Sequence, residues 1–110
     1  MRPAPSGLPT RHLVSAENGA TSLFVAEQWL RPGERVALHT HPVEEVLVFL
    51  AGEGKATIGD ERSPIAAGVS LFVPARVVHG FSSLGAEDLH VLVVFPSPHF
   101  AETTFIEDES

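Results

Sequence analysis

Residues 33–52 read GERVALHTHPVEEVLVFLAG, and this stretch decides the fold. Its last part, Val46 to Leu50, is an unbroken run of β-branched, aromatic and leucine residues, which is typical of a buried strand. Apolar residues from position 43 onward also fit a helical period, which Pro42 could open and Gly52 could close. We favour the strand because a run about five residues long suits a strand better than a one-sided helix.

Turn residues recur about every ten positions on both sides of this stretch, which is the cadence of an all-β sandwich or barrel. Pro32 and Gly33 fit a type II turn, because Pro presets φ and Gly tolerates a positive φ. Similar signals divide the rest of the chain, and we find no repeat or internal linker. The predicted strands are residues 22–30, 35–41, 45–51, 55–58, 69–73, 78–82 and 89–95.

The length of 110 residues predicts one domain over residues 1–110, with a proline-rich arm at 1–10 and an acidic tail at 107–110. The net charge is -7, with 7 Lys and Arg against 14 Asp and Glu and no basic run, so nucleic acid is not an expected partner. No apolar run has the length of a membrane span or a signal peptide, which predicts a cytoplasmic protein without membrane contact.

The chain has no cysteine, so a metal site would need histidine and carboxylate ligands. On a strand, His39 and His41 project from the same face about 7 Å apart, and Glu45 can return to them across a short turn. Two imidazoles and a carboxylate are a donor set that first-row divalent metals accept. On a helix the two histidines would diverge, so the strand and the metal site depend on each other.

The spacing Gly33-x5-His39-x-His41-x3-Glu45-x6-Gly52 resembles the first motif of the cupin family at every fixed position. The second motif is Gly-x5-Pro-x-Gly-x2-His-x3-Asn. Gly68, Pro74 and His79 match it, whereas Arg76 and Ser83 replace its second Gly and its Asn. The Arg76 replacement predicts a turn of different backbone shape.

The resemblance implies a double-stranded β-helix, a small jelly-roll barrel lined by alternate side chains of each strand. It also implies that His39, His41, Glu45 and His79 hold one divalent transition metal per chain, which could be Fe, Mn, Ni, Cu or Zn. It further suggests a homodimer. Metal affinity is expected to fall as the pH drops through the usual histidine range near 6.5, because protons compete for the same nitrogens.

Strand parity gives the expected lining of a substrate pocket near the metal. Arg35 shares a face with His39, Leu47 and Phe49 share one with Glu45, and Phe81 shares one with His79. These side chains predict a small and partly apolar substrate. Arg35 or Arg76 could clamp a carboxylate on it.

Glu27 and Gln28 precede the Pro32 turn, and alternation places one of them inside the barrel without saying which. The inward residue is a candidate for acid-base work or for orienting a ligand of the metal. We predict a metal-dependent enzyme acting on a small molecule, with dioxygenase chemistry preferred. The alternatives are a metal-dependent isomerase or lyase and a non-catalytic module that binds a metal or small molecule.

Overall fold

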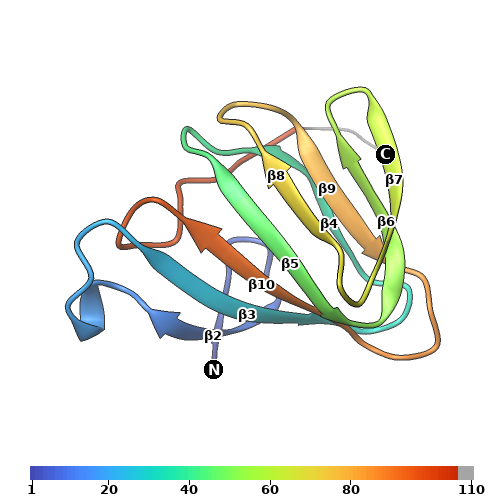
Figure 1. The fold of residues 1–110 in the computed structure, drawn as a ribbon, viewed down its shortest axis with the longest axis horizontal. Helices are drawn as coiled ribbons and strands as arrows, with labels where there is room; N and C mark the ends of the chain where they lie inside the picture. The colour runs from blue at the N-terminus through green and yellow to red at the C-terminus, as the bar shows by residue number, and fades with distance from the viewer. Residues whose placement is uncertain (107–110) are drawn as a thin grey trace.

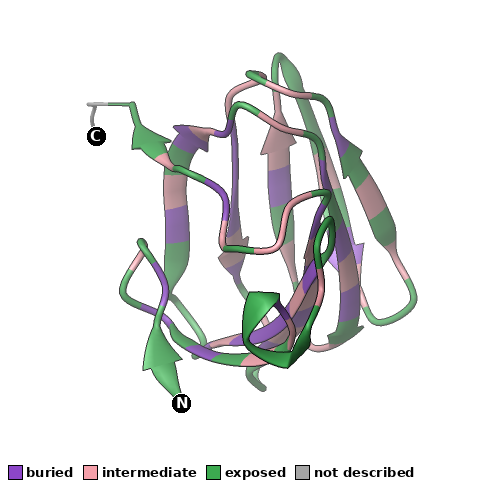
Figure 2. Ribbon diagram, turned by 90° about the vertical axis from the view of Figure 1, so that its left-hand side faces the viewer, coloured by how far each residue is buried: buried purple, intermediate pink, exposed green. Residues whose placement is uncertain are grey.

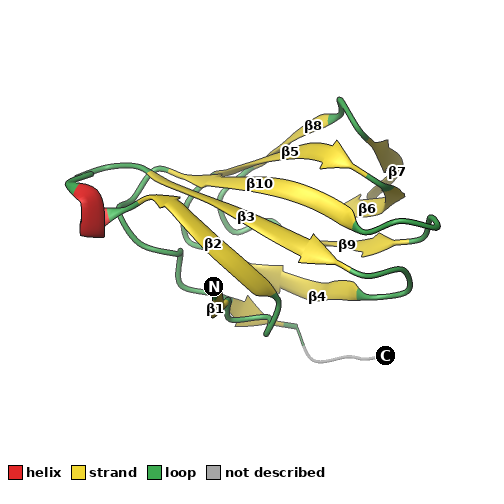
Figure 3. Cartoon of the chain, turned by 90° about the horizontal axis from the view of Figure 1, so that it is seen from below, coloured by secondary structure: helices red, strands yellow, loops and turns green. Residues whose placement is uncertain are grey.

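The structure is a computed structural model that describes residues 1–106, and the predicted acidic tail at 107–110 lies outside the described residues. The chain forms two antiparallel β-sheets that face each other as separate layers (Figure 3). The six-stranded sheet has the order β1-β2-β3-β10-β5-β8, and the five-stranded sheet has the order β11-β4-β9-β6-β7. Figure 1 shows β3, β10, β5 and β8 of the first sheet side by side.

The strands are β1 (Arg2–Pro3), β2 (Pro9–Val14), β3 (Phe24–Leu30), β4 (Arg35–Thr40), β5 (Glu45–Ala51), β6 (Glu53–Ile58), β7 (Glu61–Ala66), β8 (Ser70–Val73), β9 (His79–Ser83), β10 (Leu89–Phe95) and β11 (Thr104–Phe105). A single 3-10 turn, η1, covers Ala16–Asn18 within the described chain. The predicted all-β class and the double-stranded β-helix are confirmed. Within residues 1–106 the structure contains no helix of the length and apolar character needed to cross a membrane.

The strand predicted at residues 45–51 is present as β5, and the rival helix is not formed. Its side chains alternate: Leu47 and Phe49 are buried, whereas Val46 and Leu50 are exposed on the outer face. Burial alternates regularly along β10 as well, and bands of different burial follow one another along the strands of both sheets (Figure 2). The core between the sheets is therefore built from alternate residues of each strand, as the period of a strand requires.

Two longer strands, β2 and β7, were not predicted because their sequences are polar. β7 also contains Pro64, which lacks the N–H that a central strand would use. The structure explains this proline, since β7 is the last strand of the five-stranded sheet and pairs only with β6. A sequence pattern that looks for apolar alternation does not find an edge strand of this kind.

Both ends of the motif stretch are glycine turns. The Glu34 N–H donates to the Arg31 carbonyl over 2.9 Å and Gly33 has φ 89°, which confirms the predicted type II turn. Gly52 has φ 86°, and a Cβ there would lie 2.5 Å from the Asp88 carbonyl oxygen. This turn therefore needs glycine for its backbone conformation and for the close approach of the chain before β10.

The predicted N-terminal arm folds back on its own chain. Residues Arg2 and Pro3 pair with Thr10 and Pro9, and Ala4 and Leu8 are buried. The segment between them therefore lies against the barrel, where it takes part in the site described next.

Candidate metal centre

Strand pairing brings the four motif residues to one place inside the barrel. His39 on β4 and His79 on β9 are cross-strand partners in the five-stranded sheet. His41 directly follows β4, and Glu45 is the first residue of β5 in the opposite sheet. The cluster therefore spans both layers, and each residue is at least 95% buried.

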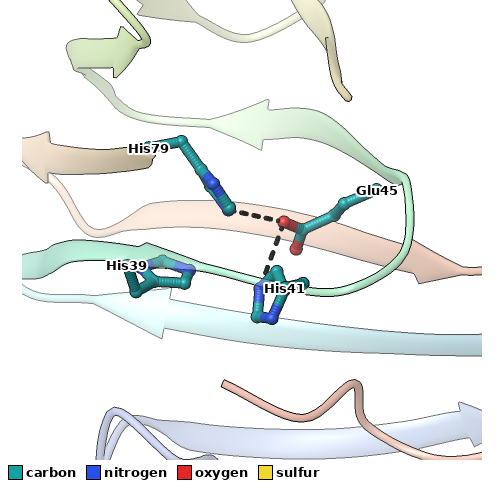
Figure 4. A group of neighbouring side chains, drawn as sticks. All are labelled: His39, His41, Glu45 and His79. Atoms are coloured by element: carbon teal, nitrogen blue, oxygen red, sulfur yellow. Dashed lines mark hydrogen bonds and ion pairs between the residues drawn. The ribbon is translucent and has the colours of Figure 1, made fainter. Parts of the chain in front are cut away.

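The possible ligand atoms of these residues all lie within 4.8 Å of one another. The His79 Nε2 atom is 2.9 Å from Glu45 Oε1, and His41 Nε2 is 3.5 Å from the same oxygen. Figure 4 shows His41 and His79 directed at the Glu45 carboxylate, with His39 beside them. The ring centroids of His39 and His79 are 4.2 Å apart.

All three histidines are oriented by backbone carbonyls through Nδ1. The distances are 2.7 Å from His39 to Ala37, 3.0 Å from His41 to Glu102, and 2.9 Å from His79 to Val77. A carbonyl only accepts hydrogen bonds, so Nδ1 of each ring carries a proton and each ring turns its Nε2 atom toward the cluster. This is the arrangement that fixes histidine ligands around a metal.

The same contacts require positive charge at the centre of the cluster. A lone pair on His79 Nε2 facing a carboxylate oxygen at 2.9 Å is repulsive unless a proton or a cation lies between them. Burial, with a smaller contribution from the neighbouring His79, lowers the pKa of His39 to about 4. Burial also lowers the pKa of His41, against the opposing effect of Glu45.

The donor set therefore fits a divalent transition metal. Three imidazole nitrogens and one carboxylate oxygen converge in a buried volume, and burial disfavours the protonated rings of His39 and His41 that would compete with the ion. Four protein ligands leave up to two positions open on a six-coordinate ion.

A small hollow of about 20 Å³ adjoins the cluster, which is room for an ion or one water molecule. Its walls are mainly apolar, and no Lys or Arg lines it. Segments from both ends of the chain cover it. The lining residues are Pro5, Ser6, Gln28, Val36, His39, His41, Glu45, Phe81, Phe100, Thr103 and Phe105. The residues contributed by the terminal segments were not predicted, because no motif or strand period connects them to the histidines.

The predicted pocket residues are only partly at this hollow. Phe81 lines it, whereas Leu47 and Phe49 are buried in the core further along β5. Arg35 is exposed and lines a different hollow on the outside of the five-stranded sheet, because β4 is irregular between Val36 and His39 and same-face parity is lost there. The predicted carboxylate clamp is therefore absent from the metal pocket.

Glu27 and Gln28 lie on opposite faces of β3. Gln28 points inward, lines the hollow, and its Nε2 donates to Thr10 Oγ1 over 3.3 Å. Glu27 lies on the outer face of the sheet, where Arg11 Nε donates to it over 2.7 Å and His90 Nε2 over 3.0 Å. Glu27 is consequently removed from the candidate catalytic residues.

Arg76 is exposed and does not line the hollow, so its predicted role in the pocket is also corrected. It has φ 68°, which is the left-handed conformation that glycine favours at a position where the second motif has glycine. The Arg76 N–H donates to the carbonyl of His41 over 2.7 Å. The turn therefore keeps a glycine-like backbone, contrary to our expectation, and holds the chain beside a metal-ligand candidate.

The fold and the site together define a jelly-roll barrel with a buried three-histidine, one-glutamate cluster. The sequence profile of the cupin domain matches residues 26–95, and the chain belongs to the cupin family. Protein SchB of Streptomyces halstedii is 37% identical over 78 residues, covering 70% of this chain and 55% of SchB. Polyketide synthase CurC of Streptomyces cyaneus is 33% identical over 85 residues, covering 73% of this chain and 55% of CurC.

This chain thus spans about half the length of these two relatives. Among solved structures, the polyketide cyclase RemF from Streptomyces resistomycificus has a TM-score of 0.79 at 22% identity. The superposition covers 91% of this chain and 71% of RemF. At that identity the likeness establishes the shared fold.

Proposed function

We propose that this protein is a metal-dependent cupin enzyme that acts on a small, neutral and partly aromatic carbonyl compound. The observation that carries the proposal is the buried histidine and glutamate cluster, which opens onto a hollow walled by phenylalanines. Because no Lys or Arg lines the hollow, a substrate with a free carboxylate or phosphate has no cationic side chain to pair with there.

A divalent metal held by the cluster would supply Lewis-acid polarisation of a carbonyl or enolate oxygen. The protein's own groups would then position the substrate. Gln28 is anchored to Thr10, which itself donates to the Leu8 carbonyl, so its amide is held at the wall of the hollow. Phe81, Phe100 and Phe105 offer apolar walls that would exclude water from the reacting carbonyl.

The covering segments must open to admit an organic substrate, because the hollow holds little more than an ion. Residues 5–6 come from the N-terminal segment and residues 100–105 from the C-terminal segment. His41 donates to the Glu102 carbonyl, so the C-terminal segment both covers the hollow and orients a metal-ligand candidate.

The names of CurC and RemF support a non-oxidative reaction on a polycarbonyl compound, such as cyclisation. The dioxygenase predicted from the sequence is the alternative, because a six-coordinate ion would keep open positions for oxygen and substrate. Product formation from aromatic β-diketones and polyketones, with and without oxygen, distinguishes them. We expect product under anaerobic conditions; stoichiometric oxygen uptake would instead establish the dioxygenase.

Gln28→Ala tests the role of the hollow in this reaction. We expect kcat/KM to fall about tenfold or more, because the substrate loses a positioning hydrogen bond in a buried site. Glu27→Gln is the matched control one residue away on the outer face, and it should leave kcat/KM unchanged. Equal losses in both variants, or no metal-dependent turnover in the native protein, would contradict the proposal.

We also propose that the protein forms a homodimer through the outer face of the six-stranded sheet. Val46, Leu50 and Phe72 are 37%, 41% and 55% exposed there. The outward side chains of β2, β3, β10, β5 and β8 include one Arg and one Glu, which pair with each other, so two acidic chains can approach without repulsion at this face. Five strands of four to seven residues, spaced about 4.8 Å apart, cover roughly 500 Å² as a flat sheet. One partner contributes about 800 Å² to a standard interface, so the relief of the side chains has to supply the remaining area.

The oligomeric state in sedimentation tests the dimer. Phe72→Asp should produce a monomer, because the acid on the edge strand β8 would be desolvated within an apolar interface. Leu84→Asp is the control, since Leu84 is 63% exposed but does not lie on this face. A native protein that sediments as a monomer at micromolar concentration would remove the proposal.

A further inference from the structure

The outer face of the five-stranded sheet contains a hollow of about 320 Å³ that is separate from the metal pocket. Three cationic side chains line it from three strands: Arg35 on β4, Lys55 on β6 and Arg62 on β7. Thr57 and Ser82 add hydroxyl groups to the same lining, and no Asp or Glu among residues 1–106 belongs to it. The volume lies in the range of small-molecule sites.

The strand register explains why these cations converge. Ser82 on β9 pairs with Arg35 on one side and with Lys55 on the other, so the two cations flank it about 10 Å apart. In the next row Thr57 pairs with Gly80 on β9 and with Arg62 on β7. The long side chains of the three cations can therefore reach one central point.

The hollow stays open at Gly80, which has no side chain to fill it. This glycine is buried, and a Cβ at this position would lie 2.7 Å from the carbonyl oxygen of Val36. The backbone of β4 crosses so closely here that no side chain fits, and the row between the cations stays open. The hollow is therefore a consequence of strand packing rather than of a flexible loop.

The cations of this hollow have no ion-pair partner among residues 1–106, although the chain carries 14 acidic residues against 7 basic ones. Arg2 and Arg11 each pair with a glutamate. In the described part of the chain, Arg35, Lys55 and Arg62 form no ion pair with a carboxylate. Three like charges that line one hollow repel one another, and an anion placed between them offsets that repulsion.

We infer that this hollow binds a small molecule through a phosphate group. Arginine offers a planar fork of donors that matches a phosphate, lysine adds a compact charge, and the hydroxyls of Thr57 and Ser82 can donate to the remaining oxygens. The site is separate from the metal pocket. It lies on the reverse side of the same two strands, because β4 carries Arg35 outside and His39 inside, and β9 carries Ser82 outside and His79 inside.

Calorimetric titration with inorganic phosphate tests this inference, with potassium chloride of equal ionic strength as the salt control. We expect saturable binding to the native protein and the same binding after a chelator has removed the metal. Arg35→Gln and Arg62→Gln should each weaken phosphate binding about tenfold or more, because each removes a charge-assisted hydrogen bond. Arg76→Gln is the matched control, since it removes the same charge from an exposed site outside the hollow.

Four outcomes would overturn the inference. The first is the absence of saturable phosphate binding to protein whose circular dichroism shows the native fold. The second is an equal loss of affinity in Arg76→Gln, which would make the effect one of net charge. The third is binding that disappears with the metal, which would place phosphate at the histidine cluster. The fourth is binding of citrate without binding of phosphate, which would assign the hollow to polycarboxylates.

Discussion

Removal of the metal should lower the melting temperature of the protein by about 10–20 °C at pH 7.5. The ligands come from both sheets, so an ion that binds them binds the folded chain and not the unfolded one. At a free metal concentration about 100 times the dissociation constant, this contributes about 2.7 kcal/mol to the free energy of unfolding. A domain of this size shifts by about 4–8 °C for each kcal/mol.

The structure also sets the pH at which this effect disappears. The sequence alone suggests a loss near pH 6.5, the ordinary pKa of histidine, but burial lowers the pKa of His39 to about 4 and also lowers that of His41. Protons therefore compete with the metal for His39 and His41 in the folded protein only in more acidic solution. The difference in melting temperature between loaded and stripped protein should persist at pH 6 and vanish toward pH 4.

The stripped protein should itself lose stability over the same range. The pKa of His39 is lower in the folded state than in the unfolded state, so the unfolded chain binds more protons between about pH 6.5 and 4. Stability is then fully present above pH 6.5 and falls as the pH decreases toward 4, by about 3 kcal/mol for a difference of this size.

Differential scanning fluorimetry with elemental analysis of each sample provides the assay. His39→Ala should abolish the response to chelator, whereas His99→Ala, at an exposed position outside the cluster, should retain it. If a chelator demonstrably removes the metal and the melting temperature does not move, the cluster is not linked to folding and the reasoning fails.

Four further substitutions test individual elements of the structure. Gly52→Ala should reduce the free energy of unfolding, measured by urea titration, by about 2–4 kcal/mol, because the added Cβ meets backbone at 2.5 Å. Gly68→Ala is the control: Gly68 has φ 94° but open space around it, so this substitution should cost about 1 kcal/mol. Glu45→Gln should keep the circular dichroism spectrum and weaken metal binding at least about tenfold, since the amide brings no charge; unchanged metal content with lost activity would make Glu45 a base instead of a ligand. Arg76→Gly should leave stability unchanged or raise it by up to about 1 kcal/mol, because it relieves a left-handed φ, and a clear loss of stability would show that the arginine side chain contributes to the turn.

Much of the fold was predictable from local pattern. The run at residues 46–50 and the turn residues around it are short-range signals, and β5 and the Pro32-Gly33 turn formed as they indicate. The spacing of His39, His41 and Glu45 is also local, and a strand period turns it directly into geometry. His79 was found only through a resemblance, because its place opposite His39 depends on pairing between strands that are far apart in the sequence.

The rule that alternate residues of a strand share a face failed where the backbone was irregular. The two-residue period of a strand predicted that Arg35 shares a face with His39. An irregularity in the pairing of β4 with β9 separates them and puts Arg35 outside the barrel. Parity also left open whether Glu27 or Gln28 faces inward. The answer depends on which side of β3 the second sheet packs against, and this is not a property of β3 alone.

The amino-acid sequence by itself determined the all-β class, the positions of the main strands along the chain and the three ligand candidates within one motif. Each of these depends on neighbours a few residues apart. Only the tertiary structure decided which groups share a space. It placed Gln28 at the metal cluster, covered the hollow with both terminal segments, oriented His41 through the distant Glu102 carbonyl, and gathered Arg35, Lys55 and Arg62 on the reverse face. The physical reason is that cross-strand register and the packing of two sheets join residues far apart in the chain, and no local spacing encodes those contacts.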